Sequence, residues 1–101
     1  MENKMFFLPQ SAKRVLMHRQ PVSMRWGHDK LAKICSDAGY DLNANDVFLF
    51  FNKSKDSIKI YFKDSEGDQS VMKKLERGGF LLPVAKGDQQ FTKISPISLI
   101  A

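Results

Sequence analysis

The sequence predicts a single α+β domain in which one main amphipathic helix packs on a small antiparallel sheet of three to four strands. Three observations lead to this prediction. One segment repeats apolar residues with the helical period, one short run is apolar on both faces of a strand, and a third run alternates apolar and polar residues. A chain of 101 residues with 43% hydrophobic content suits one core, so residues 1–101 are expected to form one domain.

The helix is predicted between Ser23 and Gly39. Ser23 is a favourable N-cap residue, and Gly39 is a typical stop signal. Between them, apolar or small residues recur at three- and four-residue steps and define one face: Met24, Gly27, Leu31, Ile34, Cys35 and Ala38. Cys35 is therefore expected to be a packed side chain, and as the one cysteine of the chain it excludes an internal disulfide.

Three further runs predict strands. Residues 15–17 form a brief apolar strand ahead of Pro21, and residues 47–51 predict a central strand that is covered on both faces. In the third run, apolar Ile58, Ile60 and Phe62 alternate with Lys59, Tyr61 and Lys63, which predicts a strand with one wet face. Polar turns are expected at residues 41–46, 52–56 and 64–67.

Two segments resist assignment. Residues 68–77 fit a helix, with Val71, Met72 and Leu75 on one face, and the competing interpretation is a third antiparallel strand. Residues 84–101 are a poorly patterned tail. Both interpretations of the first segment remain open from the sequence.

The charge balance favours an acidic or polyanionic partner. The net charge is +5 with a pI near 9.5, and the first 33 residues hold seven Lys/Arg against two acids. No apolar run approaches the roughly 20 residues that cross a bilayer. The first ten residues hold only a four-residue apolar run before Pro9, too short for a signal-peptide core. We expect a cytoplasmic protein without membrane contact.

Two blocks of the sequence resemble one family. The first has the form Pro21-Val22-x-Met24-Arg25-x-Gly27-x-Asp29-x-Leu31-Ala32. The second comprises Val47-Phe48-x-Phe50-x-Asn52, Lys59-Ile60, Asp64, Gly67, Lys73-Lys74-Leu75-Glu76-Arg77-Gly78-x-Phe80 and Pro83. The chain is similar, over about residues 13–83, to the TnpB-type accessory proteins of insertion-sequence-66 elements, which are distinct from the RNA-guided nucleases of the same name.

The resemblance implies a supporting role in DNA transposition, in which a larger polypeptide of the element is the transposase. The sequence departs from the family pattern at several positions. Lys63 and Ser65 replace an aromatic residue and a glycine on either side of Asp64. Ser23 replaces an acid, and Asp68, Gln69, Val71 and Met72 stand where aromatic residues are typical. If those aromatic residues form a binding surface in relatives, that surface is weaker here.

Catalysis is not expected. Asp37, Asp41 and Asp46 have no spacing known for metal-dependent phosphoryl transfer, and helix ends and turns explain them better. His18 and His28 lack neighbouring ligands, so no metal or other cofactor is predicted. Gly78-Gly79 without a following Lys-Ser/Thr is a turn and not a phosphate loop.

Binding is the remaining function. Seven basic residues are candidate phosphate contacts: Arg25, Lys53, Lys55, Lys59, Lys73, Lys74 and Arg77. Arg25 is expected beside the start of the helix, where it could meet a phosphate or form an ion pair with Asp29. Tyr61 lies between two lysines on the wet strand face and could stack on a base. An ordinary solvated face with lysines protecting a sheet edge is the simpler alternative.

We therefore expect a non-enzymatic accessory factor of transposition whose partners are DNA and the cognate transposase. Its basic residues would contact DNA. The alternative is a protein adaptor that docks on the transposase through Trp26, Leu75 and Phe80 without contacting DNA.

Overall fold

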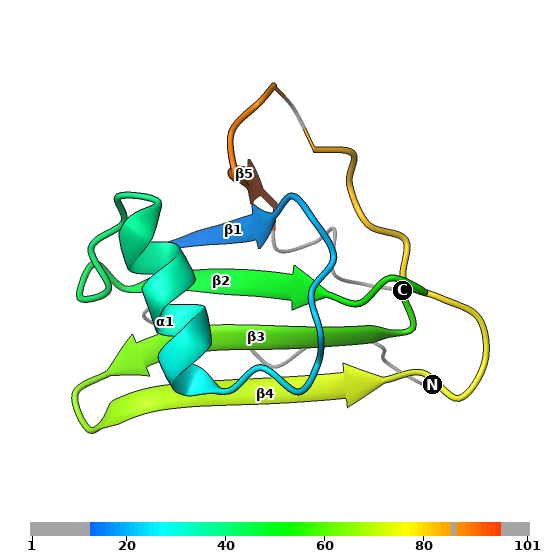
Figure 1. The fold of residues 1–101 in the computed structure, drawn as a ribbon, viewed down its shortest axis with the longest axis horizontal. Helices are drawn as coiled ribbons and strands as arrows, with labels where there is room; N and C mark the ends of the chain where they lie inside the picture. The colour runs from blue at the N-terminus through cyan, green and yellow to red at the C-terminus, as the bar shows by residue number, and fades with distance from the viewer. Residues whose placement is uncertain (1–12, 86, 96–101) are drawn as a thin grey trace.

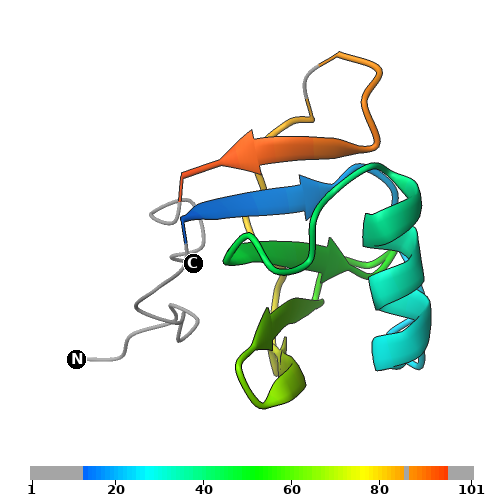
Figure 2. The ribbon, with the colours of Figure 1, turned by 90° about the vertical axis from the view of Figure 1, so that its left-hand side faces the viewer.

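The computed structural model describes residues 13–85 and 87–95. The apolar run before Pro9 and the last six residues of the tail lie outside the described residues. The described part contains one helix and five strands. In chain order these are β1 (Arg14–His18), α1 (His28–Asp37), β2 (Asp46–Phe51), β3 (Ser57–Asp64), β4 (Gly67–Lys74) and β5 (Phe91–Ile94). The helix lies across one face of the sheet (Figures 1 and 2).

The sheet is mixed and has five strands in the order β4-β3-β2-β1-β5. The sheet therefore has more strands than the three to four that were predicted. The prediction that all its strands are antiparallel was wrong for β1. This strand runs parallel to β2, with Val15 opposite Val47, and antiparallel to β5. Parallel neighbours need a long crossover connection, and the chain uses α1 for it. The fold consists mainly of strands.

Residues 67–74 form a strand, which settles the segment that the sequence left open. They pair with β3 in an antiparallel hairpin, with Tyr61 opposite Ser70. The Asp64 carboxylate accepts the backbone N–H groups of Glu66 and Gly67, and Gly67 has φ 138°, a conformation that suits glycine. This local turn chemistry explains why the chain reverses at once instead of starting a helix.

The core consists of two apolar clusters on the two faces of the sheet. Because side chains alternate along a strand, β2 supplies both clusters, and all six of its residues are buried. Val47, Leu49 and Phe51 point to one cluster, whereas Phe48 and Phe50 point to the other. The second cluster also contains Leu31 and Cys35 of α1 and is the layer between helix and sheet. The predicted central strand and the packed cysteine are both confirmed.

The helix begins later than the sequence predicted. Its N-cap is Gly27, and Ser23 caps a tight turn instead, in which the Ser23 side-chain oxygen accepts the Arg25 N–H and the Ser23 carbonyl accepts the Trp26 N–H. Serine is favoured in such turns as well as at helix starts, so its side chain cannot separate the two alternatives. Residues 23–26 therefore approach the sheet as a separate segment.

Tyr61 is buried, contrary to the prediction of a wet face. Its side chain is 0% exposed, because α1 covers the face of β3 that carries Lys59 and Tyr61. The Tyr61 hydroxyl donates a 2.8 Å hydrogen bond to Asp68 on β4. A residue in this position cannot stack on a base. The alternation of apolar and polar residues shows that the two faces of β3 differ. Because Lys59 and Lys63 were taken to mark the solvent face, the face that α1 covers was predicted to be exposed.

A partly buried ion pair links the two parallel strands. Arg14 of β1 donates two hydrogen bonds to the Asp46 carboxylate of β2, at 3.0 and 2.7 Å. Asp46 is 4% exposed, and its contact raises the pKa of Arg14, first through the hydrogen bond and then through charge attraction. The second ion pair of the described residues, Lys33–Asp37, lies on the surface of α1.

Replacing Asp46 by Asn is expected to lower the free energy of unfolding by about 2 kcal/mol, because the buried pair loses one charge-assisted hydrogen bond. Asp37→Asn is the matched control, since it removes the same charge from an exposed pair and should change stability by less than about 0.5 kcal/mol. Urea unfolding followed by circular dichroism measures both. Equal effects of the two variants would contradict a structural role for the Arg14–Asp46 pair.

Candidate functional site

The turn between β2 and β3 is held by its own side chains. The Asn52 side chain donates to the Asp56 carboxylate (2.7 Å) and accepts the Ser57 N–H (3.0 Å), while the Ser54 hydroxyl donates to the same carboxylate. These bonds, above all that from Asn52, hold the pKa of Asp56 below its usual value, and the charge of Lys74 adds to the effect. The turn is thus a fixed platform at one end of the sheet.

The segment that follows β4 docks on this turn. Leu75 donates its N–H to the Asp56 carbonyl (2.8 Å), and Phe80 donates its N–H to the Lys55 carbonyl (2.7 Å). A Cβ atom on Gly79 would lie 3.1 Å from that same carbonyl oxygen, so glycine suits the close approach, and a larger residue would require the turn backbone to move by a few tenths of an ångström. Gly78, with φ 71°, makes the bend. The Leu75–Phe80 motif is therefore explained by docking, and Gly78-Gly79 is a turn.

The segment between β1 and α1 also attaches to this end of the sheet. Val22 donates its N–H to the Phe51 carbonyl (2.8 Å). The Lys59 ammonium donates to the carbonyl oxygens of Met24 (2.8 Å) and Trp26 (3.0 Å). These two bonds hold the backbone on either side of Arg25 over β3.

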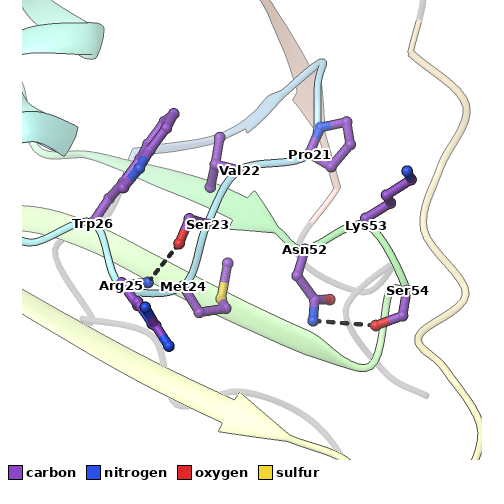
Figure 3. Close-up of a pocket in the computed structure, with 9 residues that line it drawn as sticks. All are labelled: Pro21, Val22, Ser23, Met24, Arg25, Trp26, Asn52, Lys53 and Ser54. Atoms are coloured by element: carbon purple, nitrogen blue, oxygen red, sulfur yellow. Dashed lines mark hydrogen bonds between the residues drawn. The ribbon is translucent and has the colours of Figure 1, made fainter.

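An open groove of about 730 Å³ lies between this segment and the turn, lined by residues 21–26 and 52–54. Figure 3 shows Arg25 and Lys53 on the two sides of the groove, with their side chains pointing away from each other. Both residues are exposed. The groove is therefore flanked by positive charge on both sides.

Six of the seven predicted phosphate contacts gather around one end of the sheet. Figure 1 shows this end on the right, where β1, β2 and β4 finish and β3 begins. The six residues, which we call the basic end, are Arg25, Lys53, Lys55, Lys73, Lys74 and Arg77. Lys73 and Lys74 point to opposite faces of β4, because the first pairs with Ile58 and the second with Ser57. Among the described residues, none of the six belongs to an ion pair.

Lys59 does not belong to this surface. Its side chain is partly buried and its ammonium group donates to two backbone carbonyls, so it acts as an anchor inside the protein. The sequence indicates weakly that Lys59 differs from the other six candidates, because it is the one that lies in the middle of an alternating strand.

The opposite end of the sheet carries most of the acids. It holds the loop before β2, the start of β2, the turn between β3 and β4, and the end of α1 (Figure 1). Its six acids are Asp37, Asp41, Asp46, Asp64, Glu66 and Asp68. Of the other described acids, Asp56 and Glu76 lie at the basic end, and Asp29 lies in the first turn of α1, four residues after Arg25. The Asp56 carboxylate is occupied by the turn. Charge is therefore polarised along the strands.

The residues predicted to contact a protein partner differ in exposure. Trp26 is half-buried, packs against the cluster beneath α1, and has the Lys30 ammonium 4.0 Å from its ring centre. Leu75 is also half-buried, whereas Phe80 is only 5% exposed and belongs to the core on the opposite face. Phe80 is therefore a docking anchor of its own segment. The sequence did not single out Leu81 and Val84, which are 80% and 85% exposed.

The remaining candidates have simple roles. The Arg25–Asp29 ion pair is absent from the described residues, and the Arg25 side chain makes no hydrogen bond there. His18 is buried and bonds Gln20 and Gln90, while His28 bonds Ser70. No group of three or more metal-binding side chains occurs in the part of the chain that is described. In the same part, no helix has the length and apolarity to cross a membrane.

The family comparison agrees with the two blocks seen in the sequence. The family model described as IS66 Orf2 like protein matches residues 13–99, which is most of the chain. The chain belongs to the IS66 Orf2-like family. Membership implies a transposition-associated accessory role, and catalysis is not a known activity of the family. No curated protein and no solved structure gives a significant match.

Most family-motif residues of this IS66 Orf2-like protein have a structural explanation. Val22, Leu31, Phe48 and Phe50 are core residues, Asn52 and Asp64 hold turns, and Gly27 caps α1. Arg25 differs, because its exposed side chain has no partner among the described residues. A motif residue that the fold does not require is a candidate for binding.

Replacing Lys59 by Met is expected to release residues 24–26 from β3 and to lower stability by about 1–2 kcal/mol, since two carbonyls lose their charged donor. The single tryptophan reports the change directly: its emission should shift to the red and acrylamide should quench it more strongly. Lys63→Met, an exposed position on the same strand, is the control and should leave the spectrum unchanged. An unshifted Lys59→Met spectrum would show that the segment is held by other contacts.

Proposed function

We propose that this IS66 Orf2-like protein is a non-catalytic accessory factor of transposition that binds DNA through the basic end. The supporting observation is that six cations gather around the groove and the docked turn, away from most of the acids, and that none of them forms an ion pair with another described residue. Cations gathered on one surface attract the phosphate backbone, whereas the same charges spread evenly would not favour a direction of approach.

The geometry favours contacts to phosphates over contacts to bases. The groove is bordered by Arg25 and Lys53, and the face that holds Tyr61 is closed by α1. Arg25 is the first residue we assign to phosphate, because a guanidinium can donate two parallel hydrogen bonds to one phosphate group. Binding with little sequence preference is therefore expected from the protein alone.

A second function rests on a different observation. Leu81 and Val84 are highly exposed apolar side chains on the segment that leaves the docked turn, and Trp26 is only half-buried. An adaptor that docks on the transposase through these three side chains, without DNA contact, would explain their exposure.

The triple variant Arg25→Ala/Lys53→Ala/Arg77→Ala separates the two functions. If the basic end contacts phosphates, the variant should bind labelled duplex at least tenfold more weakly at low salt. The slope of log affinity against log salt should become shallower by about 0.9 for each lost contact. Fluorescence anisotropy on element-end and random duplexes, at four or more salt concentrations, measures both quantities.

The control removes the same number of charges away from the basic end, as Lys13→Ala/Lys33→Ala/Lys63→Ala. Equal weakening by both triple variants would mean that net charge alone attracts DNA. If the wild-type protein does not bind either duplex at low salt, the adaptor is favoured. Loss of transposase pull-down by Leu81→Ser/Val84→Ser, with DNA binding intact, would support the adaptor directly.

A further inference from the structure

Strand β4 presents an open edge in the sheet of the described residues. It is the first strand in the order β4-β3-β2-β1-β5 and pairs on one side with β3. It is eight residues long, and two of its apolar side chains are exposed, Val71 at 36% and Met72 at 53%. A long edge strand with exposed apolar side chains tends to pair with a strand of another chain. The open edge of β4 therefore raises the question of which strand pairs with it.

The hydrogen-bonding groups that point outward can be identified. Leu75 directly follows β4 and donates its N–H to Asp56, which precedes β3, so odd-numbered residues turn their backbone groups toward β3. The even-numbered residues Asp68, Ser70, Met72 and Lys74 therefore turn their N–H and C=O groups to the open side. A second strand must match this set.

The charges of the edge complement a copy of the same strand. Asp68 lies near one end of β4 and Lys74 at the other, following the polarity of the whole sheet. If two copies of β4 run antiparallel around Val71, Asp68 faces Lys74 of the second copy, twice. Ser70 then faces Met72, and Gln69 faces Lys73. All four outward-pointing residues pair in this register, and no like charges face each other within the strand.

We propose that β4 pairs with β4 of a second copy of this chain, antiparallel and centred on Val71. The two sheets then join into one, and the Val71 side chains of the two copies meet at the two-fold axis. The register is specific because it alone pairs both charges and every outward-pointing residue. The inference does not depend on DNA binding, and its test contains no DNA.

Cysteine cross-linking tests the register. Residues that face each other without direct hydrogen bonds have Cα atoms about 4.5 Å apart, within the range that a disulfide spans. Val71→Cys should therefore form a covalent dimer under mild oxidation. The control is Gln69→Cys on the same face of β4, whose two copies would lie about 14 Å apart. Cys35 is buried, and burial raises the pKa of its thiol to about 12, so it stays unreactive.

We expect Val71→Cys to cross-link at least tenfold faster than Gln69→Cys, and the wild-type protein to sediment as a dimer at micromolar concentration. Lys74→Glu should shift the wild-type dimer toward monomer, because it places two acids opposite each other. Adding Asp68→Lys to that variant should restore the dimer. Circular dichroism confirms that each variant is folded.

Three results would overturn the proposal. The first is a wild-type monomer at every concentration tested, and the second is a dimer in which both cysteine variants cross-link at the same rate. The third is protection of the β4 amides from hydrogen exchange only when the transposase is added, which would assign the edge to a strand of that protein.

Discussion

The arrangement around the basic end depends on the turn between β2 and β3. Asn52 and Asp56 fix its shape, and its carbonyls receive the N–H groups of Leu75 and Phe80. The adjacent end of β2 receives Val22. Two segments that are distant in sequence, residues 75–80 and residues 21–26, are thus attached to this turn and the adjoining end of β2. Because each segment carries at least one of the exposed cations, the turn determines the spacing of positive charge.

Much of the fold could be predicted from apolar spacing. The central position of β2 followed from a run that is apolar on both faces, and the buried side of α1 followed from the three- and four-residue repeat. The start of α1 could not be predicted, since a serine caps turns and helices alike. The five-residue β1 carried no sign of its parallel partner, because direction depends on the connection and not on the strand's own residues. β5 has four residues and too little alternation to be recognised.

The residues of the candidate site could be predicted from the sequence, but the role of each residue could not. The seven basic candidates were identified from the sequence, and the fold brings six of them to the same end of the sheet. Lys59 and Tyr61 were both predicted on a solvent-exposed face, and for the same reason. Lysine usually indicates an exposed face, whereas the ammonium group of Lys59 donates to two backbone carbonyls of the segment that precedes the helix. Phe80 was taken for a surface anchor because its motif lacks strand or helix periodicity, although its N–H and its ring both dock internally.

The pairing of β1 with β5 joins positions near the two ends of the described chain, since Val15 lies opposite Ile94. During synthesis, β1 is made before β5, and its outer side must wait for a partner until residues 91–94 have been made. Loop-closure entropy makes such a distant contact slow, so we expect β5 to join the sheet after the other strands. In a chain that stops before residue 91, the strand holding Leu16 and Met17 would leave one edge without a strand partner and open to pairing with another chain, which makes premature termination a route to aggregation.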